Sequence, residues 1–152
     1  MDKIDWKILA ELEMDGRLSF AELGERVALS KSPCWARVRE LERSGVIRGY
    51  SAVVDPGAIG LAVHCLVSVR ISFDKHAEFE QAVLDHPAIM ECHTIAGDSD
   101  YMLRVHSRSV EHLDELLRNG LAKLPGVHRL STIVCLKAIK PHSSLSKWAA
   151  IA

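Results

Sequence analysis

The spacing of apolar residues changes once along this 152-residue chain, and the change separates two regions of different structure. Up to about residue 50 apolar residues recur at intervals of three and four, which is typical of amphipathic helices. From Leu61 onward they alternate or form short runs between turn residues, which is typical of strands. We therefore predict an α+β protein with a helical domain over 1–50, a linker strand and turn over 51–60, and a second domain over 61–141. The tail over 142–152 is weakly patterned, and we expect it to be mobile unless Trp148 docks it.

The helical region contains start signals for three helices. Ser19 and Glu22 have the spacing of a capping box at the start of the second helix. Ser30 or Ser32 is suited to cap the third. The inward stripe of this third helix consists of Cys34, Val38 and Leu41. Two short helices joined by a tight turn, the second of them basic, predict a helix-turn-helix.

The third predicted helix carries the charge that nucleic acid requires, although the net charge of the chain is −1. Residues 30–50 hold five basic side chains and two acidic ones, whereas residues 1–29 hold four and seven. Arginine, lysine and serine on an outward helix face are suited to phosphates and to base edges in the major groove of double-stranded DNA. A solvated basic face is the alternative, but an exposed Trp35 on a basic helix argues against it. We predict DNA contacts from Ser30, Lys31, Ser32, Trp35, Ala36, Arg37, Arg39 and Arg43.

The second region is predicted to contain four strands and two helices in the order β-α-β-β-α-β, which is the order of a ferredoxin-like sandwich. The predicted strands cover residues 61–71, 89–96, 100–106 and 127–139. The predicted helices cover residues 75–86 and a segment capped by Ser109. Between the two regions, residues 46–54 are predicted to be extended, as a wing or a linker strand.

Composition and motifs argue against several other classes of protein. No apolar run approaches the roughly 18 residues of a membrane span, and the acidic N-terminus is unlike a secretory signal, so we expect a cytoplasmic protein without a membrane partner. Four widely spaced cysteines without a C-x-x-C motif predict buried thiols. The neighbours His64 and Cys65 would point to opposite faces of a strand, as would Cys92 and His93, so we predict no metal site. Neither a nucleophile elbow nor a phosphate loop is present, and we predict no enzymatic activity and no cofactor.

Five segments of the chain resemble, in their order and spacing, the Lrp/AsnC (feast/famine) family of transcriptional regulators. They cover residues 9–17, 29–42, 45–50, 97–103 and 124–127. The resemblance extends over about residues 2–142. It implies an amino-acid-responsive second domain that pairs into homodimers, which assemble further to a tetramer or octamer with DNA outside. It also implies an effector site between neighbouring subunits, formed by the loop residues Gly97, Asp98, Asp100 and Tyr101 and by the strand residues Ser131, Thr132 and Ile133.

The loop has suitable chemistry of its own. Gly97 lets backbone approach a ligand closely, and N–H groups of such a turn hold a carboxylate. Asp98 or Asp100 is suited to an amino group, and Tyr101 offers an apolar wall. A plain hairpin turn explains the same residues equally well.

The function that we predict is sequence-specific DNA binding by a transcriptional regulator, modulated by a small effector of the amino-acid class. The alternative is a metabolic ligand-binding or enzymatic ferredoxin-like protein whose N-terminal helices serve only for docking. The basic third helix favours the first, because a docking element has no need of five basic groups and a tryptophan.

Overall fold

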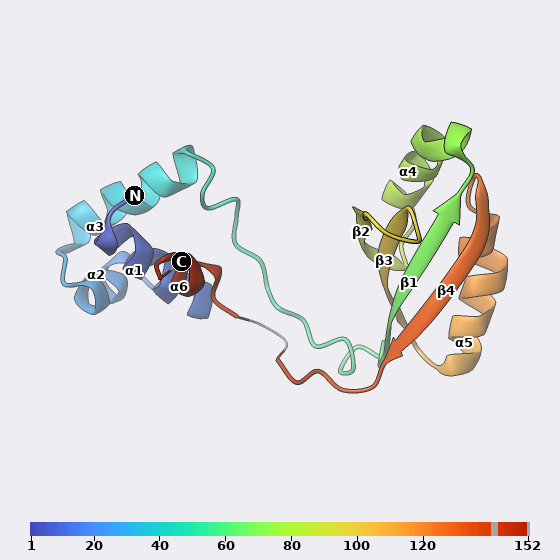
Figure 1. Ribbon diagram of the computed structural model, residues 1–152. Helices are drawn as coiled ribbons and strands as arrows, with labels where there is room; N and C mark the ends of the chain where they lie inside the picture. The colour runs from blue at the N-terminus through green and yellow to red at the C-terminus, as the bar shows by residue number, and fades with distance from the viewer. Residues whose placement is uncertain (141–142, 152) are drawn as a thin grey trace. The chain divides into compact units, whose positions relative to one another are not determined.

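The computed structural model describes residues 1–140 and 143–151, and the chain divides into two compact units (Figure 1). One unit combines Met1–Val53 with Lys140–Ala152, and the other is Val54–Ile139. The predicted domain end at residue 141 and the predicted start of the tail at 142 lie outside the described residues. The described part of the tail forms a helix in the first unit, whereas the sequence predicted a mobile segment.

The first unit contains the three predicted helices, α1 (Lys3–Met14), α2 (Phe20–Val27) and α3 (Lys31–Arg43). The predicted capping box at Ser19 is present at the start of α2. Ser30 occupies the N-cap position of α3, but within the described residues its side chain makes no capping hydrogen bond. The apolar faces of the three helices form one core of Ile8, Leu9, Leu23, Val27, Cys34, Val38 and Leu41.

The turn between α2 and α3 depends on a close backbone approach at Gly24. The Gly24 carbonyl accepts a 2.8 Å hydrogen bond from the Leu29 N–H, which closes the end of α2. Ala28 makes this closure possible by adopting a left-handed conformation with φ of 59°. A Cβ atom on Gly24 would lie 2.6 Å from the Leu29 carbonyl oxygen, so the two segments pack at a distance that only glycine permits.

Residues 46–62 form no strand, although the sequence predicted a wing or linker strand over 46–54. Val53 and Val54 are both exposed. A strand requires a neighbouring strand to pair its backbone N–H and C=O groups, and no strand of the described residues pairs with this segment. Local β-propensity therefore predicted an extended conformation but not strand pairing.

The second unit is a four-stranded antiparallel sheet in the order β2-β3-β1-β4. The strands are β1 (Val63–Ile71), β2 (Ile89–Thr94), β3 (Tyr101–Ser107) and β4 (Val127–Cys135). The helices are α4 (His76–Leu84), preceded by a short 3-10 turn (Phe73–Lys75), and α5 (Val110–Glu115), continued by a π turn (Leu116–Gly120) and a 3-10 turn (Leu121–Lys123). The predicted β-α-β-β-α-β order and ferredoxin-like fold are confirmed.

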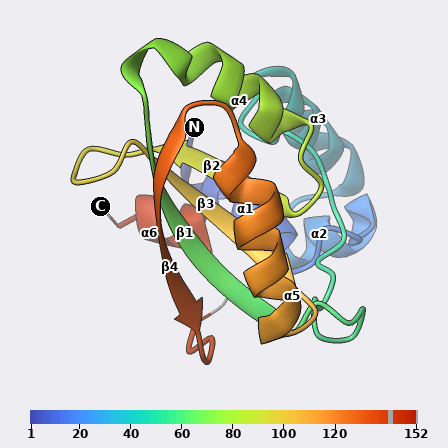
Figure 2. The same cartoon turned by 90° about the vertical axis from the view of Figure 1, so that its right-hand side faces the viewer.

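Helices α4 and α5 cover one face of this sheet (Figure 2). Side chains alternate between the two faces along β1, and on the covered face Cys65, Val67 and Val69 are fully buried under the helices. The neighbouring His64 points to the opposite face, as predicted for adjacent strand residues. Helices of this unit leave that opposite face open, and it presents His64, Leu66, Ser68 and Arg70 from β1 with their cross-strand neighbours.

A further helix, α6 (Leu145–Ala149), packs beside α1 in the first unit (Figure 1). The Glu13 carboxylate of α1 accepts hydrogen bonds from the Leu145 and Ser146 N–H groups at 3.1 and 3.2 Å and from the Ser146 hydroxyl at 2.5 Å. The Ser144 hydroxyl donates to the same carboxylate. Burial raises the pKa of Glu13, but these hydrogen bonds outweigh it, so the pKa lies below its usual value.

Replacement of Glu13 by alanine is expected to release α6 from α1, because the N–H groups at the start of α6 lose their acceptor. Amide hydrogen exchange across residues 145–150 is the measurement, and exchange there should accelerate. Lowering the pH should also release α6 from α1. Because the folded pKa of Glu13 lies below the unfolded one, its contribution is complete above the unfolded pKa and is lost as pH falls through the folded pKa. Glu25→Ala, which removes an exposed carboxylate of α2, is the matched control. Unchanged exchange in Glu13→Ala would contradict this role.

Candidate functional site

The outward face of α3 is exposed in the first unit, as a DNA-reading helix requires. Trp35 retains 48% of its accessible surface. The other exposed side chains of this face are Lys31, Ser32, Ala36, Arg39 and Arg43. Ser30, at the N-cap, is also exposed. The inward stripe is buried as predicted, so packing of α3 on the core fixes which side chains face outward.

Two arginines of this face are held by glutamates of the same helix. The Arg39 Nη1 atom lies 2.9 Å from Glu42 Oε2, and its guanidinium stands 5.8 Å from the centre of the Trp35 ring. Arg43 binds both oxygens of Glu40, at 2.7 and 2.9 Å. Exposed ion pairs are worth only about 0.2–1 kcal/mol. The guanidiniums are therefore preorganised, yet free to exchange their partners for phosphates or base edges.

Arg37 has a different position from the other predicted contacts. Its Nη1 atom lies 2.7 Å from Asp5 Oδ1 and 2.8 Å from Asp2 Oδ2, which joins α3 to the start of α1. These two hydrogen bonds raise the pKa of Arg37 above its usual value. The structure therefore pairs Arg37 with α1, which the sequence did not predict, and its DNA contact stays a prediction.

In the second unit, the loop between β2 and β3 is attached to the end of β1 by Asp100. The Asp100 N–H donates to the Val69 carbonyl at 3.0 Å, and its Oδ2 accepts from the Ile71 N–H at 2.8 Å. Arg70 adds a third attachment by donating from Nη2 to the Asp98 carbonyl. Asp100 is thus engaged by backbone, whereas Asp98 is the acidic loop residue that lines a pocket.

That pocket lies on the open face of the sheet and has a volume of about 420 Å³. It is lined by Ser68, Arg70, Asp98, Ser99, Arg129 and Ser131. Arg70 and Arg129 are direct cross-strand partners between β1 and β4. Like charges directly opposite in a sheet are destabilising unless an anion lies between them. Two guanidiniums, one carboxylate and three hydroxyl groups form a surface that suits a small molecule with both an anionic and a cationic group.

Not all predicted effector residues reach this pocket. Tyr101 is fully buried, and its hydroxyl lies 2.7 Å from both Glu80 Oε1 and His76 Nδ1. Burial and the bond to Glu80 raise its pKa. Thr132 pairs with buried Val67 and so faces the helices rather than the open side. The structure therefore gives Tyr101 and Thr132 places in or beside the core.

Ser131 lines the pocket, and Ile133 lies two residues further along the same face of β4. Gly97 precedes the lining residue Asp98. Its φ is not positive, and no heavy atom of the described residues lies within 4 Å of a Cβ built on it, so the close approach predicted for Gly97 is not made within this chain. The predicted loop and strand therefore meet at this pocket, but of the predicted effector residues only Asp98 and Ser131 line it.

Sequence reasoning missed Ser68, Arg70 and Arg129. The available signal was alternation, because polar Ser68 and Arg70 interrupt the apolar run of β1 at every second residue. Which residues of β4 lie opposite Ser68 and Arg70 depends on the strand register, and alternation within one strand does not specify that register.

Comparison with known proteins accounts for both units. Residues 1–48 match the family described as winged helix-turn-helix DNA-binding, and residues 64–145 match the Lrp/AsnC ligand binding domain. The chain belongs to the Lrp/AsnC family. The resemblance noted in the sequence is thereby confirmed.

Relatives and solved structures are similar to this chain over nearly its whole length. Leucine-responsive regulatory proteins from Klebsiella pneumoniae and Escherichia coli are 39% identical over 150 residues, which is 95% of this chain and 90% of theirs. A transcriptional regulator from Neisseria meningitidis, solved as a complex with L-Met, has a TM-score of 0.92 and 34% identity, covering 95% of this chain and 96% of the other. An AsnC family regulator from Agrobacterium tumefaciens has a TM-score of 0.88 and 33% identity, with the same coverage.

This Lrp/AsnC protein is a DNA-binding transcriptional regulator with a ligand-binding domain. The predicted function is confirmed at that level, and the alternative of a metabolic protein with a helical docking element is not supported. No helix within the described residues has the length and apolar character needed to cross a membrane.

Proposed function

We propose that this regulator binds double-stranded DNA by placing α3 in the major groove, with Lys31, Arg39 and Arg43 as the charged contacts. The observation that carries the proposal is the exposed cationic face of α3 opposite a fully buried stripe. Ser30, Ser32, Trp35 and Ala36 complete this contact face. Arg37 supports it by holding α3 against α1.

Replacing Arg39 by alanine is expected to weaken operator binding by about 1–3 kcal/mol, because a guanidinium that contacts a base contributes about that much discrimination. Lys31→Ala is expected to weaken binding to all DNA alike and to reduce the salt slope by about one, because it contacts phosphate. Salt titrations of operator and of unrelated DNA separate the two effects. Lys123→Ala, an exposed lysine of the second unit, is the control. An Arg39→Ala protein that binds its operator unchanged would refute the assigned face.

We further propose that the 420 Å³ pocket binds a free amino acid as the effector. Arg70 and Arg129 are suited to its carboxylate, and Asp98 to its ammonium group. The relative from Neisseria meningitidis, solved with L-Met, supports an amino acid as the ligand class.

We propose that the chain acts as a homo-oligomer, with the open sheet face as the first candidate interface. Ile133 on this face keeps 60% of its surface exposed in the single chain, and Leu66 is its direct partner across the strands. Apolar side chains on an uncovered sheet face favour association. We also infer that the regulator works in the cytoplasm, where its DNA is, and that it has no enzymatic activity.

A screen of all amino acids by thermal shift tests the effector proposal. A ligand at a hundred times its dissociation constant stabilises the folded protein by about 2.7 kcal/mol, which displaces the unfolding transition measurably. Any hit is then added to an operator-binding assay and to a mass measurement by light scattering. An amino acid that stabilises the protein and changes either DNA binding or mass supports the proposal. If every amino acid leaves all three measurements unchanged, the effector belongs to another class.

A further inference from the structure

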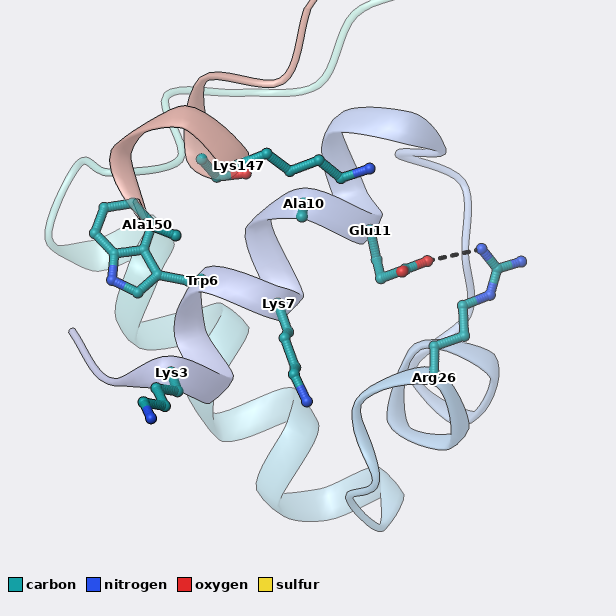
Figure 3. Close-up of a pocket in the computed structure, with 9 residues that line it drawn as sticks. Lys3, Trp6, Lys7, Ala10, Glu11, Arg26, Lys147 and Ala150 are labelled. Carbon is teal, nitrogen blue, oxygen red and sulfur yellow. Dashed lines mark hydrogen bonds and ion pairs between the residues drawn. The ribbon is translucent and has the colours of Figure 1, made fainter. Parts of the chain in front are cut away.

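A second hollow, of about 550 Å³, lies entirely within the first unit between α1, α2 and α6 (Figure 3). Its lining residues are Lys3, Trp6, Lys7, Ala10, Glu11, Arg26, Ser146, Lys147 and Ala150. Figure 3 shows Trp6 and the Glu11–Arg26 pair on opposite sides of the exposed α1 surface, with Lys7 between them. The hollow exists because α6 is docked on α1, since three of its lining residues come from the C-terminal segment.

The charges around this hollow are unbalanced. Four lining side chains are cationic, whereas Glu11 is the lining carboxylate, and its Oε2 atom already lies 2.9 Å from Arg26 Nη1. Lys3, Lys7 and Lys147 form no ion pair with any carboxylate of the described residues. Like charges gathered around one concave surface attract an anion.

The inner surface of the hollow is apolar. The Trp6 ring packs partly against the core of the first unit and is only half-buried, so the rest of it faces the hollow. Ala10 from α1 and Ala150 beyond α6 add two methyl groups. Lysine stems contribute further apolar surface while their ammonium groups reach solvent. A volume of this size is in the range of small-molecule sites.

This chemistry differs from that of the sheet pocket. The sheet pocket is lined by Asp98, whose carboxylate is suited to an amino group, whereas here Glu11 is already paired with Arg26. An α-ammonium group would therefore meet surrounding lysines and no available carboxylate of the described lining. A phosphate ion alone would leave the Trp6 surface uncovered.

We propose that this hollow is a second ligand site, which takes a small apolar monocarboxylate without an amino group. Its apolar body lies on Trp6, Ala10 and Ala150, and its carboxylate binds the Lys7 ammonium group. A ligand in this position contacts α1 and α6 together. Its binding therefore strengthens the docking of the C-terminal helix on the DNA-binding unit.

The probe for this site is 3-phenylpropionate, titrated into the full-length protein while tryptophan fluorescence is recorded. A saturable change is expected, and Trp6→Phe should remove it. L-Phenylalanine has the same skeleton with an added α-ammonium, and 3-phenylpropanamide lacks the charge. Each is expected to bind about tenfold more weakly, the loss expected for one charge-assisted contact. Equal binding of the acid and either analogue would overturn the proposal.

Two variants test the assigned geometry. Lys7→Glu is expected to weaken 3-phenylpropionate binding by about tenfold or more, because it places a like charge beside the carboxylate. The control Lys123→Glu changes the same charge in the second unit and should leave the affinity unchanged. Glu13→Ala is expected to weaken binding as well, because it undocks the helix that supplies Lys147. Unchanged affinity in Lys7→Glu, or loss of 3-phenylpropionate binding in the presence of an equal concentration of inorganic phosphate, would overturn the site.

Discussion

Replacing Gly24 by alanine is expected to abolish operator binding by unfolding the first unit. The added methyl group would lie 2.6 Å from the Leu29 carbonyl oxygen, which is backbone and cannot move aside without opening the turn into α3. Overpacking of this kind costs about 1–3 kcal/mol or more, and a unit built on three short helices has little stability in reserve. The core that positions α3 includes Leu23 and Val27 on either side of this glycine.

Circular dichroism on heating and amide exchange measure this effect. Exchange in α2 and α3 should become fast in Gly24→Ala, whereas β1 and β3, whose core is separate, should stay protected. Glu25→Ala, at the next residue of the same helix, is exposed and should behave like the parent protein. If Gly24→Ala binds its operator with the parent's affinity and protection, the close approach at this turn is not required.

Replacing Arg129 by alanine is expected to abolish the response to the amino-acid effector while effector-free operator binding remains. Loss of one charge partner in a binding site costs about 2–5 kcal/mol, which corresponds to roughly 30- to 5,000-fold in affinity. Asp98→Asn should have a comparable effect by removing the partner of the α-ammonium. Operator binding is titrated with and without the effector identified by screening, alongside a thermal-shift titration.

The comparison of Asp98→Asn with Asp100→Ala makes this test specific. Asp100 holds the loop through the Ile71 N–H, so its loss should lower stability as well as the response. Asp98→Asn should leave the melting temperature near that of the parent and remove the response alone. An intact response in both Arg129→Ala and Asp98→Asn would locate the effector site elsewhere.

Much of the fold could be predicted because its signals are local. The Ser19–Glu22 capping box and the stripe of Cys34, Val38 and Leu41 indicated where helices begin and which face they bury. The apolar residues over 61–71 similarly indicated the strand β1. These features depend on residues a few positions apart, which a sequence displays directly.

The parts that could not be predicted depend on partners distant in sequence. Arg37 has the residue type of a DNA contact, but the nearby start of α1 supplies Asp2 and Asp5. Tyr101 matches the effector motif, but the register of β3 turns it into the core toward Glu80. The prediction of a wing strand was wrong for the same reason, since no strand in the described part of the chain pairs with residues 46–54.

The packing of α6 beside α1 makes the sheet unit an insertion within the helical one, because segments before and after the sheet unit belong to the same helical unit. Two covalent tethers therefore join the units instead of one, and rotation of either unit has to satisfy both. A cut in the first tether leaves the second in place. Dissecting the protein at a single linker position would also separate α6 from the helices it packs on. A circular permutant that joins the two ends and opens at residue 57 would keep the helical unit continuous in sequence.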